Sequence, residues 1–258
     1  MMSSRYCGGP ASDRPEGIGS IRFIGGFPQD TAVAAYPYSR DHRDVHDVLR
    51  VRLLLAVELA EASSYGKAFP KGDSHSLRGE LEIESDDLGA PHLVIRGAEG
   101  PGISFSYSRD TLWAALCGRD CRCGIDAAAG GDFSGDYPFH RAFGSNEIEN
   151  FLPVAGGNRA EAAALVWSAK EALVKALGCA FHLMDPLRVR VGLRGLWGEA
   201  VLLTARVESR CGEKPAEGSL QAVSLAALPV QRTWVSVAVT DRNGRACVKS
   251  RRAGKREE

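Results

Sequence analysis

The chain has 258 residues, of which 44% are hydrophobic and 25% are charged, and both values are typical of folded globular proteins. A short peptide and a wholly disordered chain are therefore excluded, and the length suffices for one large domain or two smaller ones. Thirty-two basic residues balance 32 acidic residues, so no net charge attracts the chain to nucleic acid or to an anionic membrane.

Targeting and redox signals favour the cytoplasm. The seven cysteines are an odd number and are spread loosely along a chain that is too long to need disulfides. Residues 1–20 hold Gly, Pro, Asp and Arg where a secretory signal would be apolar, and no later segment reaches the ~18 apolar residues of a membrane span. We therefore expect a cytoplasmic protein that is neither exported nor inserted into a membrane.

Four segments are expected along the chain. Residues 1–18 are rich in small residues and residues 241–258 form a polar, basic tail, so both ends are predicted to be mobile. Between them we expect an N-terminal lobe over 19–120 and a C-terminal lobe over 121–240. The tail could contact an acidic partner, although a solvated terminus explains its composition as well.

The N-terminal lobe is predicted to open with a helix. Apolar residues recur at helical spacing through 41–62, which indicates one long amphipathic helix. Short alternating or β-branched segments follow with Gly and Pro between them, at 81–85, 92–96, 103–108 and 112–117. These segments are expected to form an antiparallel sheet.

The C-terminal lobe repeats this order of elements. Helices are predicted over about 137–151 and 158–178, and strands over 187–192, 200–208 and 233–240. The fold class is therefore α+β, with two similar lobes that each place a long helix on a small antiparallel sheet. No residue-level repeat supports the similarity, which depends on the order of elements alone. A cleft between the lobes is the expected place for a ligand site.

The segment Val166–Gly178 carries charged residues on one helical face. Trp167, Glu171 and Lys175 are spaced by four residues and so lie on the same side of the helix, which Gly178 is placed to end. Glu171 and Lys175 could form an ordinary surface ion pair, worth about 0.3–0.5 kcal/mol. Spacing alone does not separate this reading from a functional one.

Two other acidic residues stand out. Asp126 is predicted at the end of an apolar strand that precedes a Gly-rich break, so its carboxylate would face the cleft. Mg²⁺ takes one or two protein carboxylates and completes its shell with water and phosphate oxygens, and Asp126 with Glu171 could supply that pair. Glu147 is expected to begin a short helix after Ser145 or Asn146, where an acid also complements the helix dipole.

These segments resemble the 4′-phosphopantetheinyl transferases, specifically the two-lobed class that activates peptide and polyketide synthases. The likeness rests on Gly124–Asp126, on Phe143 followed by Glu147, and on the segment 167–178, in the family's order. Weaker similarity extends back to the helix at 41–62. The resemblance implies transfer of the phosphopantetheine arm of coenzyme A to a serine of an acyl or peptidyl carrier protein, with release of adenosine 3′,5′-bisphosphate.

The resemblance also implies residue roles. Asp126 and Glu171 match the family's magnesium ligands, and Glu147 matches the proposed general base. Lys175 would neutralise the leaving phosphate, and Lys170 matches a lysine near the phosphates, although it could equally be solvated. Gly89, Pro91, Ser104 and Ser106 match residues around coenzyme A, whereas Trp167 is expected to be core packing.

Three positions depart from the family pattern. Ala128 replaces a frequent third acid, whose coordination position water can fill. Phe105 replaces the histidine of a Ser-His-Ser motif, and Ala90 replaces the lysine of a Gly-Lys-Pro motif, so two phosphate-binding side chains are missing. Arg43 or Arg50 could compensate for them.

Other readings remain open at this stage. A family member that binds the carrier protein without transferring the arm is the main alternative, and an unrelated α+β enzyme is another. Cys117, Cys121 and Cys123 lie close in sequence but lack a second pair in zinc spacing. We expect a monomer with Mg²⁺ and coenzyme A in the cleft, and a basic and apolar surface for an acidic carrier protein.

Overall fold

This computed structural model describes residues 22–23, 31–38, 45–62, 81–179, 181, 183–208 and 222–243. The expected N-terminal segment 1–18, Arg43 and the basic tail beyond residue 243 lie outside the described residues. No helix in these ranges is long and apolar enough to cross a membrane.

The described chain forms two antiparallel sheets. The first has six strands in the order β1-β2-β6-β5-β4-β3. Their bounds are β1 Arg22–Phe23, β2 Ala32–Pro37, β3 Leu81–Ser85, β4 Pro91–Ile95, β5 Ala98–Ser108 and β6 Thr111–Leu116. The second has five strands in the order β7-β11-β10-β9-β8, with bounds β7 Cys121–Ala129, β8 Val189–Trp197, β9 Ala200–Val207, β10 Val223–Val230 and β11 Thr233–Asp241. The α+β fold class is therefore confirmed.

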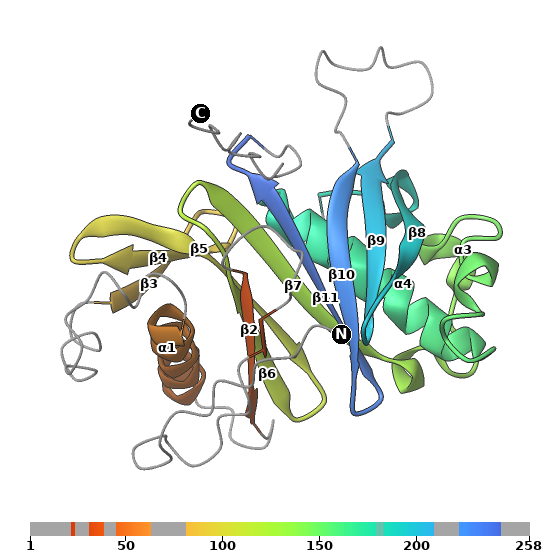
Figure 1. The fold of residues 1–258 in the computed structure, drawn as a ribbon, viewed down its shortest axis with the longest axis horizontal. Helices are drawn as coiled ribbons and strands as arrows, with labels where there is room; N and C mark the ends of the chain where they lie inside the picture. Colours follow the sequence, from red (N-terminus) through yellow and green to blue (C-terminus); the bar gives the residue numbers. More distant parts are fainter. Residues whose placement is uncertain are drawn as a thin grey trace, which may run out of the picture.

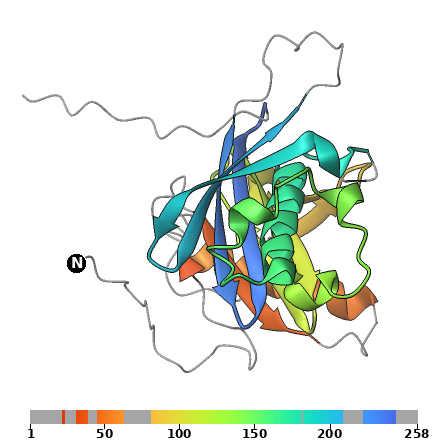
Figure 2. The ribbon, with the colours of Figure 1, turned by 90° about the vertical axis from the view of Figure 1, so that its right-hand side faces the viewer.

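One long helix packs on each sheet. Helix α1, Val45–Ala62, covers the first sheet, and helix α4, Arg159–Ala176, covers the second. Figure 1 shows α1 towards the left and α4 towards the right, behind β9 and β10, with β2, β6 and β7 between the two helices. Figure 2 shows α4 from the side, lying against the blue strands of the second sheet. Leu55 and Leu59 are fully buried from α1, as are Leu165 and Val166 from α4, so each helix contributes a separate core.

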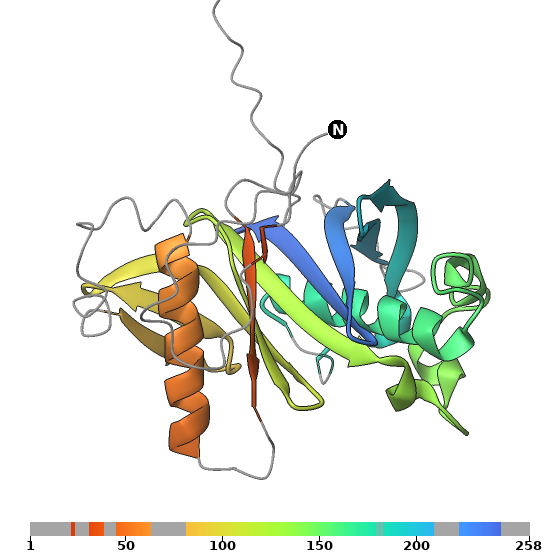
Figure 3. The same cartoon turned by 60° about the horizontal axis from the view of Figure 1, so that its bottom comes forward.

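A third core lies where the sheets meet. Val33 and Ala115 of the first sheet pack with Ile125, Val235 and Val237 of the second, and all five are buried. The chain passes from one sheet to the other between β6 and β7, and β5 runs beside β7. In Figure 3 these strands cross the middle of the molecule, between the upright α1 and the transverse α4. The two halves are therefore joined by a packed interface as well as by the chain.

Serine side chains link β5 to β7 at this interface. Ser104 Oγ accepts the Ile125 backbone N–H at 3.1 Å, and Ser106 Oγ accepts the Ala127 N–H at 3.2 Å. Both serines are buried. Since β7 pairs with β11 on its other side, the hydroxyls satisfy N–H groups that would otherwise be buried without a partner.

Several sequence predictions need correction. A helix over 137–151 is wrong: α3 spans only Phe139–Ala142, a turn follows, and a 3₁₀ turn covers Glu149–Phe151. The chain leaves the helix at Phe143, whose backbone is extended, and Asn146 is left-handed at φ 61°. Glu147 therefore lies in a turn and does not begin a helix.

The expected order of elements is also wrong in part. Each half begins with a strand before its helix, β2 before α1 and β7 before α4. Asp126 lies in the middle of β7, because small and apolar residues continue the strand to Ala129, and Gly130 and Gly131 then end it. The predicted strand end before residue 127 is therefore replaced by an interior position, at which Asp126 pairs with Ser236 of β11.

Candidate functional site

Asp126 is buried, with 5% of its surface exposed, and its carboxylate is held by two side chains. Its Oδ1 accepts the Ser106 hydroxyl at 2.8 Å and the Lys175 ammonium at 2.8 Å. A buried carboxylate is retained only when such partners offset its desolvation. Asp126 therefore joins β5, β7 and α4 at one point.

Helix α4 supplies the facing charges. Its first turn is capped by Asn158, whose side chain accepts the N–H groups of Ala160 and Glu161, and the left-handed Gly178 follows its end. One helical turn separates Glu171 from Lys175, so both side chains point to the same side. Lys175 Nζ lies 3.8 Å from Glu171 Oε2 and also bonds Asp126. The structure thus brings Asp126, Glu171 and Lys175 together.

The two carboxylates of this cluster share one ammonium group, that of Lys175, and repel each other. Burial and, after it, the neighbouring charge of Asp126 raise the pKa of Glu171 to about 7, although Lys175 opposes the shift. A second cation near the two carboxylates would relieve the repulsion. Two carboxylates match the donor set that Mg²⁺ takes when phosphates and water complete its shell. Among the described residues, no group of three or more His, Cys, Asp and Glu side chains could hold a metal.

Gly124 sets the distance between β7 and α4. A Cβ atom on Gly124 would lie 1.9 Å from the Ala172 carbonyl oxygen and 2.5 Å from the Ala176 nitrogen. Only glycine allows the strand to approach the helix backbone so closely. This approach lets Lys175 reach Asp126 and the Ile125 carbonyl oxygen, the latter at 3.0 Å.

A pocket of about 300 Å³ opens beside the cluster. Lys175 lines it, so the pocket and the acid pair share one side chain. Five basic residues contribute to the walls, namely Arg52, Arg119, Arg122, Lys175 and Arg242. Asp86 and Glu99 are the acidic wall residues, which leaves the lining with an excess of positive charge. Such a pocket suits a ligand that carries several phosphates.

The predicted loop Gly89–Pro91 forms one wall of this pocket. Asp86 Oδ1 accepts the N–H groups of Leu88 at 2.9 Å and of Ala90 at 2.8 Å, and Gly89 adopts a left-handed φ of 81°. The Ala90 N–H bond lowers the pKa of Asp86 more than any other contact. The loop is therefore shaped by its own hydrogen bonds.

Arg52 was missed by the sequence reading. Its guanidinium lies 5.3 Å from the centre of the Phe105 ring, and its Nε is buried with no hydrogen-bond partner in the described part of the chain. Burial lowers the pKa of Arg52. Arg50, which was named instead, is exposed and does not line the pocket. The spacing of Arg52 to the core residues Leu55 and Leu59 could have placed it on the buried face.

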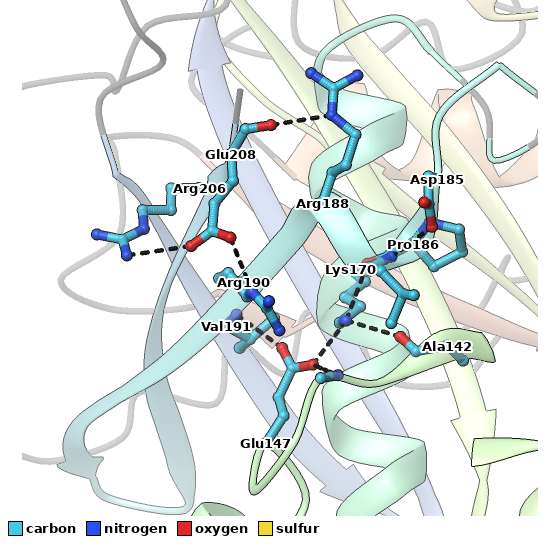
Figure 4. A network of polar contacts seen from close by, with 12 residues as sticks. Ala142, Glu147, Lys170, Asp185, Pro186, Arg188, Arg190, Val191, Arg206 and Glu208 are labelled. Carbon is cyan, nitrogen blue, oxygen red and sulfur yellow. Dashed lines mark hydrogen bonds and ion pairs between the residues drawn. The ribbon is translucent and has the colours of Figure 1, made fainter. Parts of the chain in front are cut away.

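Glu147 and Lys170 form a second, separate cluster (Figure 4). Glu147 Oε2 lies 2.8 Å from Lys170 Nζ, and their side chains are 5% and 0% exposed. Lys170 also donates to the carbonyl oxygens of Ala142 and Pro186 at 2.8 Å and 3.0 Å. Desolvation lowers the pKa of Lys170, and Glu147 opposes this shift. Lys170 does not line the pocket and is not brought to the other predicted phosphate ligands.

Both carboxylate oxygens of Glu147 accept hydrogen bonds. Oε2 accepts the Gly144 N–H at 2.9 Å as well as Lys170, and Oε1 accepts the Val191 N–H at 3.1 Å. These bonds tie the turn after α3 to α4 and to β8. Glu147 is also buried, with 6% of its surface exposed, so the base role predicted for it would require this region to open.

The remaining predicted site residues divide between the pocket and the core. Gly89, Pro91 and Ser104 line the pocket, and Ser106 reaches the site through its bond to Asp126. Trp167 packs against the rings of Phe133, Phe143 and Phe181, with centroids 5.1–6.4 Å away, which confirms its packing role.

Comparison with known families gives one finding. Residues 122–211 match the family model of the 4′-phosphopantetheinyl transferase superfamily. The matched segment is less than half of the chain. It contains β7, α4, β8 and β9 and therefore all five charged residues of the two clusters. The loop Gly89–Pro91, Ser104 and Arg52 lie outside the matched residues. No curated protein is similar enough to the chain to count as a match.

Proposed function

We propose that the protein transfers the 4′-phosphopantetheine arm of coenzyme A to a serine of an acyl or peptidyl carrier protein. The observation that carries the proposal is the convergence of Asp126 and Glu171 on Lys175, which also lines a basic pocket. The superfamily domain over residues 122–211 supports the same reaction class. In this reading the chain is of the two-lobed class, with pseudo-symmetric lobes and the active site between them.

The pocket and the acid pair would bind different parts of coenzyme A. The basic walls would take the nucleotide of coenzyme A, and Lys175 would meet the diphosphate that links the nucleotide to the pantetheine arm. Asp126 and Glu171 would hold Mg²⁺, which offsets the negative charge of the diphosphate. The carrier serine gives up its proton to a general base, for which Glu147 is the predicted residue, and its oxygen bonds to the phosphorus that bears the arm. The bond from that phosphorus to the nucleotide's phosphate oxygen then breaks. Adenosine 3′,5′-bisphosphate leaves.

Lys175 has two tasks in this mechanism. It stabilises the buried Asp126 before the ligand arrives, and it stabilises charge on the leaving phosphate as the bond breaks. Because one ammonium faces both groups, the reaction centre is preorganised. Glu147 as general base, a monomeric state and a cytoplasmic location stay predictions.

The second candidate function is carrier-protein binding without transfer, and the absence of two phosphate-binding side chains favours it. Phe105 and Ala90 offer no cation to the ligand, and a protein with these residues could hold a carrier protein without transferring the arm. Arg52 favours activity, because its unpartnered Nε and its place over Phe105 put a cation beside the position that the family's histidine would occupy.

Mass spectrometry of carrier proteins separates the two functions. The purified protein is incubated with coenzyme A, Mg²⁺ and several apo-carrier proteins, and the intact mass of each carrier is measured. We expect a phosphopantetheine adduct on the carrier serine, lost with Asp126→Asn or Glu171→Gln. The exposed Asp136→Asn and Glu82→Gln serve as charge-matched controls that keep the adduct. Carrier binding with no adduct over the whole panel would favour the second candidate.

A further inference from the structure

The far rim of the pocket holds an arginine in a fixed position. Arg242 follows β11, and its Nε and Nη2 donate to the Arg119 carbonyl oxygen at 3.1 Å and 2.7 Å. Its remaining nitrogen, Nη1, lies 2.6 Å from Glu99 Oε2 on β5. Two of the three guanidinium nitrogens are therefore used to anchor the group, and the third faces a carboxylate.

Glu99 is an anion surrounded by positive charge. Its hydrogen bond to Arg242 is the main cause that lowers the pKa of Glu99, and the charges of His92 and Arg122 lower it further. Glu99, His92, Arg119, Arg122 and Arg242 all line the pocket. Glu99 thus places a carboxylate among these basic residues, and Asp86, which lies 3.4 Å from His92, is the other acidic residue of the pocket wall.

The ion pair at the rim is accessible and easily exchanged. The side chains of Arg242 and Glu99 are 43% and 62% exposed. Exposed pairs of this kind contribute little free energy, since water screens them and two long side chains lose freedom. A phosphate group carries more charge and bonds arginine more strongly than a single carboxylate. Because the Arg119 carbonyl anchors Arg242, the guanidinium need not move when the anion at Nη1 changes.

We propose that this rim is a phosphate subsite in which Glu99 occupies Arg242 until a phosphate of coenzyme A displaces it. Glu99 would then lower the affinity for the ligand, because it competes with the phosphate for Nη1. The inference rests on the proposed function, which supplies the ligand. The phosphate could be the 3′-phosphate of the nucleotide or part of the diphosphate, and both have the same chemistry at the rim.

Calorimetric titration tests the exchange without an assay of transfer. Coenzyme A and dephospho-coenzyme A are titrated into the wild-type protein and into the variants Glu99→Gln, Arg242→Gln and the double variant. We expect Glu99→Gln to bind coenzyme A about two- to fivefold more tightly, the size of an exposed ion pair. The gain should vanish in the Arg242→Gln background, as a double-mutant cycle requires for a shared contact. Glu82→Gln removes one charge from β3, away from the pocket, and should change nothing.

Each calorimetric result either supports the proposed phosphate subsite or overturns it. A gain with coenzyme A alone assigns the rim to the 3′-phosphate, whereas an equal gain with dephospho-coenzyme A assigns it to the diphosphate; both support the subsite. Unchanged binding by Glu99→Gln, or a gain that persists with Arg242→Gln, would overturn it and leave the proposed function intact. If neither the wild-type protein nor any variant binds coenzyme A, the proposed function falls and the subsite with it.

Discussion

The raised pKa of Glu171 makes the stability of the protein depend on pH. Its pKa rises to about 7 because the carboxyl is largely removed from water and lies beside Asp126. A carboxyl whose pKa is higher in the folded protein binds its proton more tightly there than in the unfolded chain. Its contribution to stability is therefore fully present below the unfolded pKa and is lost as pH rises through the folded value.

The metal-free protein should accordingly lose stability between about pH 4.5 and pH 7 through this group. Urea unfolding at pH 5 and pH 8 should show a larger loss of unfolding free energy for the wild-type protein than for Glu171→Gln. The slope from one group is at most about 1.4 kcal/mol per pH unit. An equal loss in both proteins would show that Glu171 titrates near its ordinary value.

The Glu147–Lys170 pair is a buried ion pair whose contribution to stability can be measured. Both side chains are buried and together bond one loop, α4 and β8. Breaking such a pair leaves one charge in the interior without a partner, which costs far more than an exposed pair does.

Lys170→Met should therefore lower the unfolding free energy by about 3–5 kcal/mol, and adding Glu147→Gln should recover part of the loss. Chemical denaturation of the two single variants and the double variant measures this directly. A loss below about 1 kcal/mol for Lys170→Met, the range of an exposed pair, would contradict the structural role. If folded Glu147→Gln loses turnover while its affinity for coenzyme A is unchanged, Glu147 is the base after all.

At the scale of elements, the contact of β7 with α4 positions the site. Gly124 allows the backbones to approach, and Asp126 follows two residues later on the same strand. The geometry of the acid cluster thus depends on a residue that has no side chain.

Gly124→Ala should separate β7 from α4 and destabilise the protein by about 1–3 kcal/mol, because the added methyl group has no space. Gly131→Ala is a suitable control, since its Cβ would meet only Arg109 Nη2, at 3.5 Å. Thermal unfolding of both variants measures the difference. Equal melting temperatures for Gly124→Ala and the wild-type protein would contradict the close approach.

The elements differ in how well sequence predicts them. Helix α4 was predicted within two residues at each end, because its apolar spacing, cap and terminal glycine agree. The prediction of a helix over 137–151 failed, because the extended Phe143 and the left-handed Asn146 interrupt a segment whose composition suits a helix. Strands β2 and β10 were missed; both are short runs of small or apolar residues with no clear alternation.

Some residues of the candidate site were also predicted from the sequence, and others were not. Asp126, Glu171 and Lys175 were predicted together through their spacing and a family resemblance, and the fold brings them into contact. Arg52, Glu99 and Arg242 were not, because they come from α1, β5 and the end of β11 and meet only in the folded chain. No local pattern could indicate such a pocket wall.

At the scale of the whole molecule, both sheets contribute residues to the candidate site, which lies where they meet. The acid pair belongs to the second sheet and its helix, whereas the first sheet supplies the loop Gly89–Pro91, Ser104 and Phe105 to the pocket. The segment that matches the superfamily model holds the predicted reacting end. The part outside it holds most of the proposed nucleotide contacts, together with Phe105 and Ala90, two of the three departures from the family pattern; Ala128 lies inside the matched segment.

Metal binding tests the central claim most directly. Mn²⁺, used as a spectroscopic substitute for Mg²⁺, is titrated in the presence of coenzyme A and followed by electron paramagnetic resonance. The wild-type protein and the control Asp136→Asn should bind one ion, and Asp126→Asn and Glu171→Gln should each lose it. Equal binding of Mn²⁺ by the wild-type protein and both of these variants would contradict a shared cation between residues 126 and 171.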